Sequence, residues 1–124
     1  MTSPSNIRPR VLIVEDQALI ALALADELDA AGFEVIGPAL SVLHAFECLR
    51  TADGCDAAVL DVNLGHETAE PIAHELISLS IPFVVMSGYA RSQHPPVFRS
   101  ALSLVKPFGI QALVDELRRL VRQH

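Results

Sequence analysis

The sequence predicts an α/β domain built on a doubly wound, five-stranded parallel sheet with strand order 2-1-3-4-5. Three observations lead to this fold class. Short runs rich in Val, Ile and Leu alternate along the chain with segments of helical period, as in sheets covered by helices on both sides. The runs are continuously apolar, which is typical of strands buried on both faces. The length of 124 residues fits a single domain.

The first half of the chain predicts two strand–helix units. The run RVLIVE at residues 10–15 is the first strand, and helical spacing continues over 17–31 until a glycine, which favours a helix C-terminus. EVIGPA at 34–39 is the second strand. A helix over 41–51 follows, with Ser41 as its N-cap.

The second half of the chain continues the same alternation. Apolar runs predict three strands, at 56–62, 82–87 and 101–105. Helical spacing predicts two helices, over 67–79 and 109–123.

Two segments are expected to be less regular. The interval between the fourth and fifth strands holds RSQHPPVFRS at 91–100, and its adjacent prolines limit a fourth helix to a turn or two. That helix is therefore predicted to be short or irregular. Residues 1–8 precede the first periodic segment and are expected to form a disordered tail, which leaves 9–124 as the single domain.

Composition and charge argue against several classes of function. The net charge is −6, and none of the nine Lys and Arg residues forms a basic stripe, so no nucleic-acid partner is expected. The apolar stretch ALIALALA at 18–25 is too short to span a membrane, so no membrane insertion is expected. Cys48 and Cys55 have no metal-ligand spacing, which favours reduced thiols in a cytoplasmic protein. The five histidines are scattered and are predicted to be surface residues.

Polar side chains follow four of the predicted strands at the point where each strand ends. Glu15 and Asp16 follow the first, Asp61 the third, Ser87 the fourth and Lys106 the fifth. In the predicted order these four strands are neighbours, and ligands of such sheets bind beyond the carboxyl ends of the strands. We therefore expect the five residues to converge on one pocket.

The acidic part of this pocket predicts a metal site. Carboxylates crowded together repel one another unless a cation lies among them. Oxygen ligands without His or Cys indicate a hard divalent ion, Mg²⁺ or Mn²⁺. Asp16 and Asp61 are the predicted direct ligands, Glu15 would act through water, and the backbone carbonyl of Asn63 would complete the set.

The remaining chemistry of the pocket suits transfer of a phosphoryl group. A carboxylate can attack a phosphoryl donor, so Asp61 would become an aspartyl phosphate contacted by Lys106 and Ser87. Two alternatives stay open. A small phosphatase with an aspartate nucleophile usually needs a second Asp two residues on, where this chain has Asn63. A binding scaffold would never take phosphate and would use the pocket only as structure.

The residues just described form a recognisable pattern over residues 8–124. The sequence resembles the receiver domains of two-component response regulators, whose fold is the flavodoxin-like order already predicted. The matching motifs, which are weak singly and specific in this order, are VED (14–16), LDVNLG (60–65), MSG (86–88) and VKPF (105–108).

The resemblance assigns a role to each residue of the pocket. Asp61 would be the phosphoacceptor, Glu15 and Asp16 the Mg²⁺-binding pair, Ser87 the switch hydroxyl and Lys106 the phosphate-contacting cation. Such a domain is not an enzyme with a separate substrate. It supports its own phosphorylation in a phosphorelay and the slow loss of the phosphoryl group.

The resemblance also implies two finer features. The peptide bond before Pro107 would be cis, which proline allows at modest cost. Asn63 and Tyr89 lie where the family tunes hydrolysis of the aspartyl phosphate.

Three departures from the common pattern define a subgroup. The acidic pair begins with Glu15 instead of the commoner Asp, and Ser103 stands where most members carry a switch aromatic. The stretch between Ser87 and Lys106 is several residues shorter than usual. With PFVVMSGY at 82–89, these features resemble the atypical FAT GUY group of receivers.

Members of that group are often stand-alone receivers paired with histidine kinases of the HWE or a related type. We therefore expect a sensor histidine kinase or a phosphotransfer protein as phosphodonor. No effector domain is expected. The output would be binding to an unknown downstream protein, phosphoryl shuttling, or action as a phosphoryl sink.

The first helix suggests where a donor docks. Its predicted inward stripe consists of Ile20, Leu24 and Leu28. Ala18, Leu19 and Leu22 lie off this stripe beside the acidic pocket, so they are predicted to dock an apolar face of the partner. The alternative is a helix simply composed of good helix formers.

Overall fold

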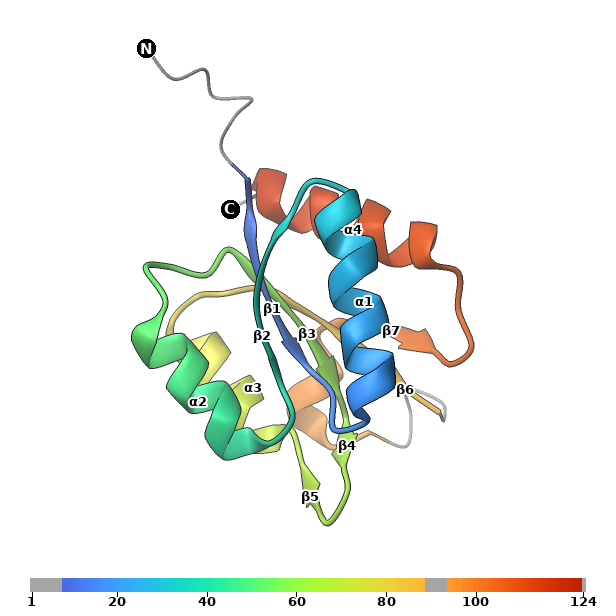
Figure 1. The fold of residues 1–124 in the computed structure, drawn as a ribbon. Helices are drawn as coiled ribbons and strands as arrows, with labels where there is room; N and C mark the ends of the chain where they lie inside the picture. Colours follow the sequence, from blue (N-terminus) through green and yellow to red (C-terminus); the bar gives the residue numbers. More distant parts are fainter. Residues whose placement is uncertain (1–7, 89–93, 124) are drawn as a thin grey trace.

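The main sheet has the predicted topology. The structure, a computed structural model, describes residues 8–88 and 94–123. Five parallel strands lie in the order β2-β1-β3-β6-β7, which is 2-1-3-4-5 in chain order and confirms the doubly wound fold (Figure 1). The strands are β1 (Arg10–Val14), β2 (Glu34–Ala39), β3 (Ala57–Asp61), β6 (Phe83–Ser87) and β7 (Leu102–Val105).

The helices cover both faces of this sheet (Figure 1). On one face lie α1 (Ala18–Ala30) and α4 (Ile110–Gln123), and on the other lie α2 (Val42–Thr51) and α3 (Glu70–Ser78). Each face has its own apolar core, and β1 and β3 are almost wholly buried between the two. Burial of this kind supplies the main favourable term in folding. No helix in the described residues is long and apolar enough to cross a membrane.

The described part of the segment between β6 and β7, from residue 94 onward, is as irregular as predicted. It holds only a 3-10 turn, η3 (Pro96–Phe98), with Phe98 fully buried against the α3 side of the sheet. Because proline lacks an N–H group, the adjacent prolines restrict a longer helix there. The edge strand β7 is only partly buried, and Leu102 and Val105 at its two ends are exposed.

The predicted start of the third helix is wrong. Residue 67 belongs instead to a small antiparallel hairpin of β4 (Asn63–Leu64) and β5 (Glu67–Thr68), and α3 begins three residues later. Gly65 adopts φ +70° in the turn, a conformation that glycine favours. Leu64 is buried beneath the hairpin, so tertiary packing overrides the helical spacing of this segment.

The inward face of α1 is rotated from its predicted position. Ala21, Leu24 and Leu28 are buried, whereas Ile20 is 39% exposed, so its assignment to the inward stripe is wrong. The small Ala21 side chain lets the helix approach the sheet at this point. Leu19 is 83% and Leu22 56% exposed, as predicted.

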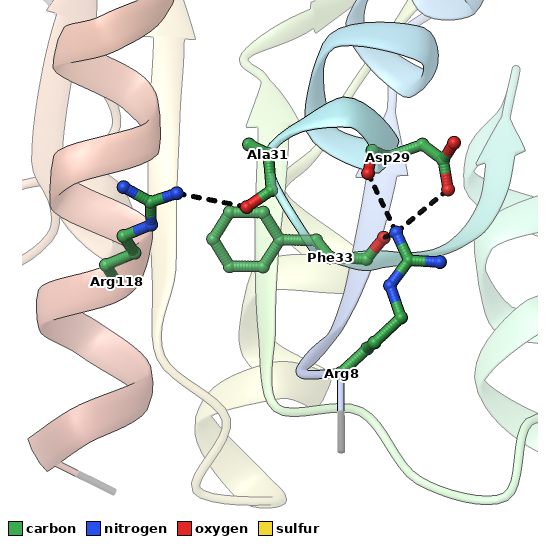
Figure 2. A network of polar contacts seen from close by, with 5 residues as sticks. All are labelled: Arg8, Asp29, Ala31, Phe33 and Arg118. Carbon is green, nitrogen blue, oxygen red and sulfur yellow. Dashed lines mark hydrogen bonds and ion pairs between the residues drawn. The ribbon is translucent and has the colours of Figure 1, made fainter. Parts of the chain in front are cut away.

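Two arginines fix the end of α1 at the edge of the sheet opposite the acidic residues. Arg118 of α4 donates to the Ala31 carbonyl at 3.0 Å, and Arg8 donates to the carbonyls of Asp29 at 2.8 Å and Phe33 at 2.6 Å (Figure 2). Cations at a helix C-terminus satisfy its free carbonyls. Residues 1–7 of the predicted tail lie outside the described residues. Arg8, its last residue, belongs to the folded domain, because these hydrogen bonds hold it against the end of α1.

Candidate functional site

The predicted pocket residues meet at the carboxyl edge of the main sheet. Glu15 and Asp61 stand at the ends of the adjacent strands β1 and β3, and Ser87 ends β6. The Lys106 amide donates to the Ser87 carbonyl at 2.7 Å, which sets the end of β7 beside β6. Glu15 is fixed in the same way, because its amide donates to the Ala39 carbonyl at 3.0 Å.

Three carboxylates form one cluster in this pocket. One oxygen each of Glu15, Asp16 and Asp61 lies within 4.8 Å of the others. Glu15 is fully buried and Asp61 is 7% exposed. The Lys106 ammonium lies 2.7 Å from Asp61 Oδ2 and 3.3 Å from Glu15 Oε1. The chain's single lysine thus supplies the cationic side of the pocket.

Burial and neighbouring charges shift the pKa values of Glu15 and Lys106 in this pocket. Burial raises the pKa of Glu15 from 4.5 to about 7, and hydrogen bonding with Asp61 and its negative charge act in the same direction, against Lys106. Burial opposes the charge on Lys106, but Asp61 and Glu15 outweigh it and raise the pKa of Lys106. The pocket therefore disfavours the ionised form of Glu15 although Lys106 lies beside it.

A hard divalent cation fits these residues. Glu15 Oε2 is buried and has no hydrogen-bond partner among the described residues. A buried carboxylate oxygen left in this state is costly unless a cation or ordered water satisfies it. The donor atoms are all oxygens, as Mg²⁺ and Mn²⁺ prefer. Asn63, two residues after Asp61, also lies at this site, because its backbone amide donates to Asp61 Oδ1 at 3.1 Å.

The other predicted residues take the following places. Ser87 is buried at the end of β6, opposite Val105 in the sheet register. The peptide bond between Lys106 and Pro107 is cis, as the resemblance implied. Tyr89 lies outside the described residues.

Two features of the site region were missed. His94 is 1% exposed rather than on the surface, so that prediction is wrong; its ring packs edge-on against Phe98, and Nδ1 lies 3.4 Å from the Ser103 hydroxyl. A second cis peptide, at Pro38, was not expected either. The burial of His94 depends on side-chain packing, which the scattered positions of the histidines in the sequence do not indicate.

An apolar groove adjoins the acidic pocket. It has a volume of about 440 Å³ and is lined by Ile20, Leu24, Met86, Lys106, Pro107 and Phe108. The partly exposed Ile20 side chain lines this groove together with Lys106 and with Pro107 and Phe108 of the turn after β7.

Comparison with solved structures identifies the class of protein. A CheY-like response regulator receiver domain from Methylobacillus flagellatus superposes with a TM-score of 0.78 and 25% identity, covering 92% of this chain and 99% of that one. No family model matches the chain. The fold, the acidic cluster and this similarity define a receiver domain.

The chain belongs to the response regulator receiver domain family. It is 36% identical to SdrG from Sphingomonas melonis Fr1, with a TM-score of 0.76 over 92% of this chain and 97% of that one. It is also 32% identical to the transcriptional regulatory protein PdtaR of Mycobacterium tuberculosis, over 98% of this chain. The chain spans 63% of the length of that relative.

Proposed function

We propose that this receiver domain is a phosphoryl-accepting switch. Asp61 would take a phosphoryl group from a phosphohistidine on a sensor histidine kinase or a phosphotransfer protein. The observation that carries this proposal is the position of the Asp61 carboxylate, which is held 2.7 Å from the Lys106 ammonium beside Glu15 and Asp16. A nucleophilic carboxylate oxygen, the Lys106 ammonium and a candidate metal site therefore lie together.

The proposed transfer conserves atoms and charge. A carboxylate oxygen of Asp61 attacks phosphorus, and the bond between phosphorus and the donor's imidazole nitrogen breaks with its electron pair leaving on that nitrogen. The nitrogen then takes a proton from solvent. Lys106 neutralises charge on the transferred oxygens, and the Ser87 hydroxyl donates a hydrogen bond to one of them. Water later hydrolyses the acyl phosphate, with Asn63 and Tyr89 tuning this loss.

A divalent cation completes the site in this proposal. Asp16, Asp61 and the Asn63 carbonyl would hold it, with Glu15 acting through water. When bound, Mg²⁺ or Mn²⁺ neutralises the negative charge that builds up on the phosphoryl oxygens.

The phosphodonor is proposed to dock on α1. Leu19, Leu22 and Ala18 are exposed on α1, which begins two residues after Asp16 of the acidic pocket. An amphipathic helix of a kinase, of the HWE type in the FAT GUY-like interpretation, would bury this surface. The output would then be protein binding or phosphoryl shuttling.

Phosphorylation is expected to depend on a divalent cation. Incubation with acetyl phosphate and Mg²⁺ should add one phosphoryl group to the intact protein, measured by mass spectrometry. Removal of Mg²⁺ with a chelator should slow this reaction by about 100-fold, because such charge stabilisation is worth several kcal/mol.

Two results would contradict the proposal. No adduct from either acetyl phosphate or a phosphorylated kinase would favour a binding scaffold. Continuous turnover of a phosphomonoester, with release of inorganic phosphate, would favour an aspartate-nucleophile phosphatase.

Docking on α1 predicts that Leu22→Lys slows transfer from a phosphorylated kinase or phosphotransfer protein. A charge placed in an apolar interface must be desolvated, so a decrease of about tenfold or more is expected. Phosphorylation by acetyl phosphate should be unchanged, since that donor needs no protein surface. Leu43→Lys is the matched control, because Leu43 is 69% exposed on α2. Equal slowing by both variants would argue against docking on α1.

A further inference from the structure

The hairpin that follows Asp61 forms one wall of the acidic pocket. The Asn63 amide donates to Asp61 Oδ1 at 3.1 Å. Gly65, in the hairpin turn, lies so close to Asp16 that a Cβ there would stand 3.6 Å from Asp16 Oδ2. The position of the hairpin therefore sets what surrounds two of the three clustered carboxylates.

The hairpin is anchored to α2 by a charged side chain. Glu67 Oε2 accepts a hydrogen bond from the Val42 amide at 3.1 Å. That amide belongs to the first turn of α2, where free N–H groups favour an anion. Ser41 satisfies a second amide of this turn, because its hydroxyl accepts from the His44 amide at 3.1 Å. Glu67 thus links the hairpin, which borders the acidic pocket, to α2, which packs on the sheet.

An anchor of this kind matters because the hairpin is small. Each of its strands has two residues, and a hairpin of that size is not stable without tertiary contacts. The buried Leu64 side chain anchors the hairpin to the core. Glu67, which pairs with Leu64 in the hairpin register, anchors it to α2. Loss of the Glu67 contact would leave the turn with more freedom while the core residue stays buried.

We propose that Glu67 is a positioning residue for the divalent cation. By fixing the hairpin to α2, it holds the Asn63 carbonyl and the Gly65 backbone in place around a cation at Asp16 and Asp61. The inference rests on the metal site of the proposed function but does not require that the protein be phosphorylated.

The test compares Glu67→Ala with Glu67→Gln. The glutamine keeps an oxygen acceptor for the Val42 amide and loses the charge, whereas alanine loses both. Mg²⁺ is titrated into each purified variant, and the dissociation constant is read from amide NMR shifts of Asn63 and Gly65. Glu67→Ala should weaken Mg²⁺ binding by about fivefold, the effect of one lost hydrogen bond, and Glu67→Gln by less than about twofold.

The controls separate positioning from other effects. Glu47→Ala removes a charge from an exposed position on α2 and should leave the constant unchanged. Thermal unfolding shows whether each variant is folded at the titration temperature. Equal Mg²⁺ affinity in Glu67→Ala and wild type, equal weakening by both Glu67 variants, or no Mg²⁺ binding in the wild type would overturn the inference. Mg²⁺ binding without a phosphoryl adduct would instead refute the proposed function alone.

Discussion

Asp61→Asn is expected to abolish formation of the phosphoryl adduct. An amide nitrogen or oxygen is a far weaker nucleophile than a carboxylate, and the other carboxylate beside Lys106, that of Glu15, is fully buried. Intact mass after incubation with acetyl phosphate and Mg²⁺ should show an adduct in the wild type and none in the variant.

The fold should tolerate this change. The asparagine oxygen can still accept from the Asn63 amide, and the side chain has nearly the same volume. One negative charge also leaves a crowded acidic cluster, so the melting temperature should not fall. An adduct of undiminished yield in folded Asp61→Asn would show that another residue accepts the phosphoryl group.

Lys106→Met is expected to slow phosphorylation by about 100-fold, the effect of removing one preorganised donor from developing charge. The ammonium lies 2.7 Å from Asp61 Oδ2, where the transferred group would be attached. Methionine retains much of the side-chain length and apolar contact but cannot neutralise phosphoryl oxygens. The rate of adduct formation at saturating acetyl phosphate and Mg²⁺ measures the effect.

Two comparisons make the lysine result specific. Arg122→Met removes the same charge from an exposed position in the last turn of α4 and should leave the rate unchanged. Lys106→Met should also be less stable than wild type without Mg²⁺, because Glu15 and Asp61 lose their nearest cation. A wild-type rate in Lys106→Met would contradict the assigned role.

Much of the sheet could be predicted from local sequence. The runs at β1, β3 and β6 are apolar on both faces, and this pattern distinguishes buried parallel strands from solvated ones. The hairpin at Glu67 could not be predicted, because two-residue strands have no period of their own. Its formation depends on the burial of Leu64 and on a helix that is distant in sequence.

The pocket residues could be predicted for a related reason. Glu15, Asp61 and Lys106 each end an apolar run, so the predicted strand order alone brings them to one edge. The exposure of Ile20 and the burial of His94 depend on side-chain packing in three dimensions. Their degrees of burial therefore became visible only in the folded structure.

The central claim is that Asp61 accepts a phosphoryl group, and mapping the modified residue tests it most directly. The protein is phosphorylated with acetyl phosphate and Mg²⁺, reduced with borohydride to convert an acyl phosphate to homoserine, and digested for tandem mass spectrometry. We predict homoserine at position 61 and nowhere else. Homoserine at a different aspartate, or none in a protein that carries the adduct, would contradict the claim.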